Sequence, residues 1–170
     1  YKNFEKYAKE SIFYSDFDPI LSLEAKTLRP ENGKFKSMKV STIETKDIMQ
    51  PGIFYGGYKR KDFVFPGLAP GAIGRYEYTK QITDPHLLSS FYFDDDINVK
   101  TSEFSVTFPK SVIVDYSVFG ALKENIVFSK EILQNKVKYT WKLNDIPAYR
   151  TEKDSPSRSY SAPHIILRIT

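Results

Sequence analysis

Few arrangements of a nucleophile beside a histidine base are possible in this chain. The 170 residues include no cysteine and two histidines, His86 and His164. A serine nucleophile acts beside a base, yet no G-x-S-x-G elbow is present. Proximity of Ser89 to His86 along the chain does not indicate a triad, because triads are assembled in space. We therefore predict no catalytic residue. We expect His86 to cap a turn, and His164, on the polar phase of the last apolar alternation, to face solvent or an adjoining domain.

Acidic residues are densest at Asp94, Asp95 and Asp96. Consecutive strand residues point to opposite faces, so three adjacent aspartates converge on a cation only where the backbone turns. The calcium-loop pattern of alternating ligands, a glycine and a distant glutamate is missing. We expect a solvated turn here, with no metal and no cofactor, and these three aspartates are the residues to test for a cation. A carboxylate-based hydrolase is a further alternative that no particular pair of acids supports.

Aromatic residues are abundant, with 13 Phe, 12 Tyr and 1 Trp. They suggest stacking on sugars or on single-stranded nucleic acid, and both uses need rings exposed on a groove. Most of the rings fall on the apolar phase of the expected strands, where a core would hold them. The exceptions flank a polar loop near the end of the chain. Two tyrosines and two arginines flank this loop, and together with the last histidine they are the candidate ligand or domain-interface residues: Tyr149, Arg150, Arg158, Tyr160 and His164.

Charge and hydropathy exclude two classes of partner. The 25 Lys and Arg residues against 21 Asp and Glu give a net charge of +4. The two signs are interspersed without a basic block, so we predict no nucleic-acid partner. No apolar run approaches the roughly 20 residues that cross a bilayer, so we predict no membrane span. Because cysteine is missing, the chain has no internal disulfide and no thiolate metal site, which leaves the cellular compartment open.

Strands must position these residues, because apolar and polar side chains alternate with a period of two through most of the chain. The clearest case is residues 136–143, where four apolar side chains from Val137 to Leu143 share one face. Turn signals, of which Asp18-Pro19 is one, recur about every ten residues. This pattern predicts an all-β fold, a large antiparallel β-sandwich of about ten or more strands.

The ends of the chain depart from this pattern. Phe4, Tyr7 and Ala8 have the i, i+3, i+4 spacing of a short amphipathic helix, so we expect one at the N-terminus. No internal repeat or low-complexity segment is evident, and we predict that residues 1–170 form a single domain. The chain starts at Tyr1 and stops directly after an apolar alternation, so we expect it to be excised from a longer multidomain protein.

Residues 62–79 read DFVFPGLAPGAIGRYEYT and carry a resemblance to a known family. This stretch is similar to part of a bacterial domain of unknown function that precedes transglutaminase-like domains. The resemblance extends over about residues 20–170, through an aromatic strand at 91–93, a strand and proline at 103–109, and the residues 139–148. Glycine and proline make turns in the matching stretch, so its motif is structural rather than chemical.

The resemblance implies a function for the whole polypeptide. Similar proteins are exported to the periplasm or cell surface, with this β-rich domain first and a papain-like Cys-His-Asp domain second, and that second domain carries the catalysis. We therefore expect a noncatalytic accessory domain whose partner is a downstream transglutaminase-like domain. A carbohydrate- or peptide-binding module is the alternative.

Overall fold

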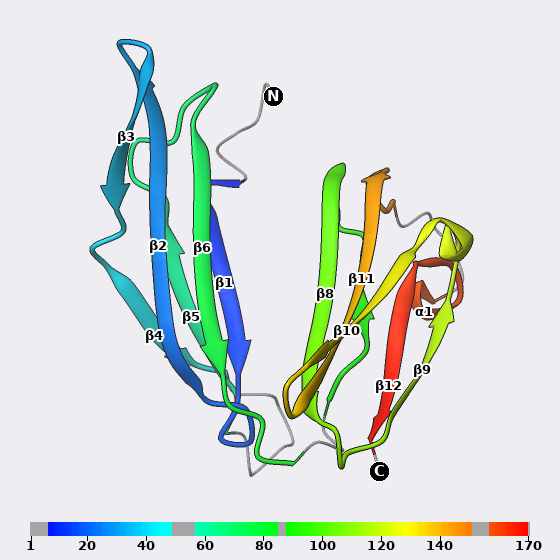
Figure 1. Ribbon diagram of the computed structural model, residues 1–170. Helices are drawn as coiled ribbons and strands as arrows, with labels where there is room; N and C mark the ends of the chain where they lie inside the picture. The colour runs from blue at the N-terminus through cyan, green and yellow to red at the C-terminus, as the bar shows by residue number, and fades with distance from the viewer. Residues whose placement is uncertain (1–6, 49–56, 85–87, 151–156, 170) are drawn as a thin grey trace. The chain divides into compact units, whose positions relative to one another are not determined.

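The computed structural model describes residues 7–48, 57–84, 88–150 and 157–169. The chain divides into two compact units, here called unit 1 (Tyr1–Asp84) and unit 2 (Pro85–Thr170). Within the described ranges, twelve strands form four antiparallel sheets of three strands each, two sheets in each unit (Figure 1). The predicted all-β fold is confirmed. The prediction that residues 1–170 form one domain stays a prediction.

Unit 1 contains the first six strands, in two sheets. The sheet orders are β1-β5-β4 and β3-β2-β6. Period-two patterns place one face of each sheet against the other. The strand bounds are β1 (Lys9–Tyr14), β2 (Ile20–Glu31), β3 (Lys34–Lys39), β4 (Ile43–Asp47), β5 (Lys59–Val64) and β6 (Ile73–Lys80).

The core of unit 1 joins its two sheets. Ile12 of β1 and Phe63 of β5 pack with Ala25 of β2, and Val40 and Phe65 complete the buried cluster. Burial of an isoleucine, valine or phenylalanine side chain is worth about 1.5–3 kcal/mol relative to exposure. The side chains of the alternate phase consequently lie on the outer faces of both sheets.

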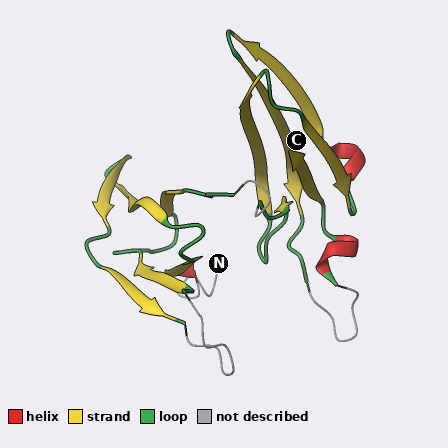
Figure 2. Ribbon diagram, turned by 90° about the horizontal axis from the view of Figure 1, so that it is seen from below, coloured by secondary structure: helices red, strands yellow, loops and turns green. Residues whose placement is uncertain are grey.

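Unit 2 has the same plan with the last six strands. The sheet orders are β7-β12-β9 and β10-β11-β8. Two short helical segments connect strands (red in Figure 2). The bounds are β7 (Phe91–Tyr92), β8 (Val99–Pro109), β9 (Val114–Phe119), a 3-10 turn (Lys123–Asn125), β10 (Val127–Leu133), β11 (Lys136–Ile146), α1 (Arg158–Ser161) and β12 (His164–Ile169).

Trp141 lies at the centre of the unit 2 core and is 0% exposed. Its ring stacks on Phe104 of β8 at 5.7 Å between ring centroids and meets Tyr116 of β9 edge-on at 4.8 Å. Phe104 belongs to the same sheet as Trp141, and the contact with Tyr116 joins this sheet to the other one. The alternation predicted for residues 136–143 is confirmed, since Trp141 and Leu143 are buried and Lys142 between them is exposed.

The expected N-terminal helix depends on Phe4, which lies outside the described residues. Among the described residues, no helix is long and apolar enough to span a membrane.

Candidate functional site

A row of three stacked rings crosses the outer face of the sheet β7-β12-β9. His164 is paired in register with Tyr92 on one side and Phe119 on the other. Its imidazole lies 4.9 Å from the ring centroid of Tyr92 and 5.2 Å from that of Phe119, with interplanar angles of 24° and 22°. Because side chains alternate along a strand, Ile165 next to His164 enters the core while the imidazole stays on the outer face.

Arg158 of α1 covers one end of this row. Its guanidinium carbon lies 4.8 Å from the ring centroid of Tyr92 and 5.5 Å from that of Tyr149, a cation–π geometry. Its Nη2 donates to the Asp94 carboxylate at 2.6 Å and to the Asp94 backbone carbonyl at 2.7 Å. The Asp94 side chain is 4% exposed, so this ion pair supplies the counter-charge that a buried carboxylate needs.

Backbone hydrogen bonds hold the covering segment, residues 157–163, on the sheet. The Phe93 amide donates to the Pro163 carbonyl at 2.9 Å, and the Ala121 amide donates to the Ser161 carbonyl at 2.8 Å. Gly120 has φ +87°, and a Cβ there would lie 2.0 Å from the Ala162 carbonyl oxygen. Only glycine permits this close approach. We call Tyr92, Asp94, Tyr149, Arg158 and His164 the Arg158 cluster.

The structure brings together three of the five predicted interface residues. Tyr149, Arg158 and His164 belong to the Arg158 cluster, whereas Tyr160 is 80% exposed and Arg150 is also exposed. The expectation that His164 faces solvent or an adjoining domain is corrected: its side chain is buried within unit 2, stacked between Tyr92 and Phe119. The His164 Nδ1 donates to the Ala162 carbonyl at 2.9 Å, which fixes the imidazole orientation.

The three adjacent aspartates diverge. Asp94 is buried and paired with Arg158, while Asp95 and Asp96 are exposed. Asp95 accepts the Asp96 amide through its side chain at 2.7 Å, as in a turn. Within the four described ranges, no group of three or more His, Asp and Glu side chains could hold a metal ion. His86 lies outside the described residues.

Sequence reasoning missed a second charged cluster, on the outer face of the sheet β1-β5-β4. The Asp62 carboxylate accepts the Ser11 hydroxyl at 2.8 Å and lies 3.0 Å from Arg60 Nε and 3.3 Å from Lys46 Nζ. Lys9 Nζ is 4.0 Å away. We call these five residues the Asp62 cluster, and two of them, Lys9 and Asp62, line a cavity of about 420 Å³. The alternation Arg60-x-Asp62 was the available sequence signal, because i and i+2 share a strand face.

Hydrogen bonds and cations lower the pKa of Asp62. The Ser11 hydroxyl is the largest cause, and the ammonium of Lys46 and the guanidinium of Arg60 add to it against the opposing effect of burial. A carboxyl with a lowered pKa stays ionised at neutral pH and is unsuited to general acid catalysis. The Asp62 cluster is therefore suited to stabilise the pairing of strands β1, β5 and β4 through ion pairs and a hydrogen bond.

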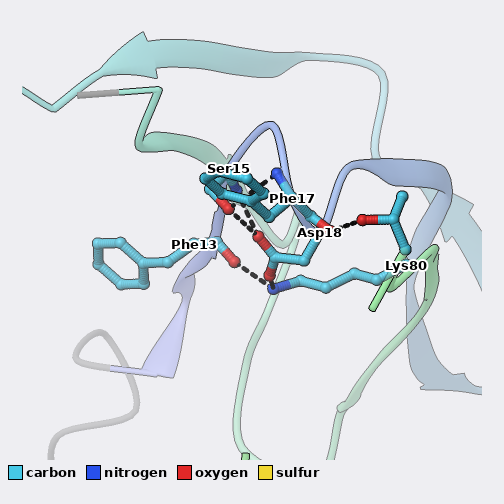
Figure 3. A network of polar contacts seen from close by, with 6 residues as sticks. Phe13, Ser15, Phe17, Asp18 and Lys80 are labelled. Carbon is cyan, nitrogen blue, oxygen red and sulfur yellow. Dashed lines mark hydrogen bonds and ion pairs between the residues drawn. The ribbon is translucent and has the colours of Figure 1, made fainter. Parts of the chain in front are cut away.

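A third polar network, drawn in Figure 3, closes the turn between β1 and β2. Lys80 Nζ donates to the Phe13 carbonyl at 2.6 Å and to Asp18 Oδ2 at 2.7 Å, and Asp18 Oδ1 accepts the Ser15 amide at 2.6 Å. Partial burial raises the pKa of Asp18, but the bonds from Lys80 and Ser15 outweigh it, and the pKa is lowered. This network confirms the turn expected at Asp18-Pro19 and ties it to the end of β6.

Comparisons with known proteins identify the fold. A family model described as "Domain of Unknown Function with solved-structure structure (DUF3857)" matches residues 2–150. No curated protein matches. A crystal structure of a protein named a "putative protease", from Parabacteroides distasonis ATCC 8503, is similar with a TM-score of 0.73 at 19% sequence identity. The similarity covers 98% of this chain and 34% of that chain, so this chain spans about a third of that protein.

Proposed function

Since this chain belongs to the DUF3857 family of domains of unknown function, we propose that it is a noncatalytic accessory domain of an exported bacterial protein. It positions a papain-like transglutaminase or peptidase domain of the same polypeptide. The family membership agrees with the resemblance noted from residues 62–79. The catalytic partner and the export are inferred from that resemblance.

The observation that carries this proposal is the share of each chain in the structural match. Nearly all of this chain, 98%, is similar to 34% of the Parabacteroides protein. The fold therefore occurs as one part of a longer chain whose name assigns it to proteases. Domains of one chain meet through interfaces that resemble those between proteins, and such an interface would let this domain position its neighbour.

The Arg158 cluster supports a structural role for this region of unit 2. Its cation is shared among Asp94, Tyr92 and Tyr149, so the charged groups satisfy one another. Tyr160 and Arg150 stand outside the cluster with exposed side chains. Tyrosine and arginine are enriched at protein interfaces, and these two are our candidate contacts for the catalytic domain.

Substitutions in the longer protein test this role. We expect Arg150→Ala with Tyr160→Ala to reduce kcat/KM for peptide or amine processing and to lower the Tm of the catalytic domain. The matched control is Tyr58→Ala, because Tyr58 is an exposed tyrosine of unit 1. Deletion of residues 1–170 should have a larger effect in the same direction. Equal activity and equal Tm after that deletion would exclude a supporting role.

Peptide binding is the second candidate function, and strand β10 is the observation that favours it. Among the described residues β10 is an edge strand that pairs with β11 alone, and all seven of its residues are exposed. Extended peptides bind such edges by adding a strand. Titration with cell-wall peptides should shift the backbone amides of residues 127–133, and a parallel titration with glycans tests sugar binding. Unchanged amide shifts with every peptide would contradict this function.

A further inference from the structure

Three cations stand in register across the outer face of the sheet β3-β2-β6. Lys26 of the central strand is paired with Lys39 on β3 and with Arg75 on β6 (strands in Figure 1). Side chains directly opposite each other on antiparallel strands have Cβ atoms only about 5 Å apart. Like charges in this arrangement repel each other and destabilise the sheet. We call these three residues the basic row.

The basic row has no internal counter-ion among the described residues. The ion pairs of the described chain use other cations: Lys9, Lys36, Lys46, Arg60, Lys80, Arg158 and Arg168. On the neighbouring sheet of unit 1, by contrast, three cations gather around one buried carboxylate, Asp62. The basic row is thus an unfavourable charge arrangement that the described part of the chain leaves without an anion within ion-pair distance.

A depression of about 320 Å³ lies over the basic row. Ser37 of β3 lines it beside the cations and supplies a hydroxyl donor. The guanidinium of Arg75 presents a planar fork of donors that matches an oxyanion, and the lysines supply point charges. The donors therefore suit phosphate or carboxylate oxygens.

Two glutamates limit the size of an anion in this depression. Glu24 and Glu77 are paired with each other and also line it. Each is two residues from the basic row on its own strand, a separation of about 7 Å along the strand. An extended polyanion crossing both rows would meet these carboxylates, whereas a compact oxyanion on the basic row would not. The two glutamates therefore make the depression unsuited to bind a nucleic acid.

We propose that Lys26, Lys39 and Arg75, with Ser37, form a binding site for a compact oxyanion, a phosphate or carboxylate group. The site is on unit 1 and is independent of the accessory role proposed above. An oxyanion bound there relieves the repulsion within the basic row, so the occupied sheet is more stable than the empty one.

Titration of the 170-residue chain by NMR tests the site, with inorganic phosphate in one arm and citrate in the other. Sodium chloride at matched ionic strength corrects for screening. We expect saturable shifts at the amides of Lys26, Ser37, Lys39 and Arg75, and the arm with the tighter binding identifies the preferred oxyanion. Shifts no larger than those in chloride, in both arms, would overturn the proposal.

Variants that remove one charge distinguish binding at this site from unspecific attraction of anions to the positively charged surface. Lys26→Gln should weaken binding about tenfold, the loss expected for one charged hydrogen bond. Lys39→Gln, at an exposed edge-strand position, should act in the same direction and serves if Lys26→Gln does not fold. Lys36→Gln is the matched control, because Lys36 is on β3 but on the opposite face. Equal weakening by Lys36→Gln would overturn the site.

Thermal unfolding gives an independent readout. Without phosphate, Lys26→Gln should raise the Tm because it relieves repulsion in the basic row. Addition of phosphate should raise the Tm of the unmodified chain more than that of the variant. A lower Tm for Lys26→Gln without phosphate would mean that Glu24 and Glu77 already compensate the row, and would overturn the proposal.

Discussion

Asp62 in unit 1 and Asp94 in unit 2 are both buried carboxylates, each with a side chain 4% exposed, but different parts of the fold hold them. Asp62 is bound by residues of its own sheet, with Ser11 directly opposite it and Arg60 two residues away. Asp94 is bound by Arg158, which comes from the covering segment 64 residues later in the chain. The first carboxylate reinforces strand pairing, and the second fastens a segment over a sheet.

The largest effect is expected where the covering segment approaches the backbone most closely. Gly120→Ala combines a left-handed backbone with a Cβ only 2.0 Å from the Ala162 carbonyl oxygen, and should cost about 3 kcal/mol or more of unfolding free energy. Gly33→Ala is the control, since Gly33 has φ +76° but nothing within 4 Å of a Cβ. It should cost about 1 kcal/mol. Urea unfolding measures the free energy of unfolding of both variants. Equal losses of this free energy would mean that the covering segment shifts to accommodate the added Cβ at no cost.

Arg158→Gln tests whether the ion pair fastens the covering segment. The substitution leaves the Asp94 carboxylate buried without its cation, and we expect a loss of about 2 kcal/mol. Hydrogen exchange of the Phe93 and Ala121 amides, which donate to the covering segment, should accelerate. Arg150→Gln removes the same charge from an exposed residue outside the Arg158 cluster and should change neither quantity. Identical behaviour of the two variants would refute the fastening role.

The Asp62 cluster should make unit 1 sensitive to acid. The pKa of Asp62 is lower in the folded protein than its ordinary value of 3.8, so the unfolded chain binds the proton first as the pH falls. The resulting stability is present above that ordinary value and is lost as the pH drops through the folded pKa. Between about pH 5 and pH 2, the free energy of unfolding measured in urea should therefore decline less steeply for Asp62→Asn than for the unmodified chain. Ser11→Ala removes the hydrogen bond that lowers the pKa of Asp62 most, so its free energy of unfolding should also decline less steeply. A decline as steep as that of the unmodified chain in both variants would contradict this role of Asp62.

The turn network of Figure 3 should give the smallest effect, because its carboxylate is more exposed than Asp62. Lys80→Gln removes the side-chain hydrogen bond and the charge that lower the pKa of Asp18. The pKa of Asp18, followed by NMR of its carboxyl carbon, should rise. The pKa of Asp62 in the same spectra is the internal control and should stay constant. An unchanged pKa of Asp18 would mean that Ser15 alone maintains it.

Much of the fold could be predicted because strand patterns are local. The alternation around Trp141 assigned its face correctly, and Asp18-Pro19 marked a real turn. Three residues of the Arg158 cluster were among the predicted candidates: Tyr149 and Arg158 for their place beside a polar loop, and His164 for its place on the polar phase of the last strand. Burial of His164 was missed because the polar phase of a strand indicates its outer face but not whether another segment covers that face.

The sequence alone determined the all-β class, the phase of the strands and the family, because each depends on neighbouring residues or on a continuous motif. Tertiary structure decided how the strands divide into four sheets and which charges meet. Ser11, Lys46 and Asp62 come together only through strand register, and Arg158 meets Asp94 only because the covering segment packs beside residue 94 in the folded chain. Register and closure depend on contacts between residues far apart in the chain, which period-two alternation does not encode.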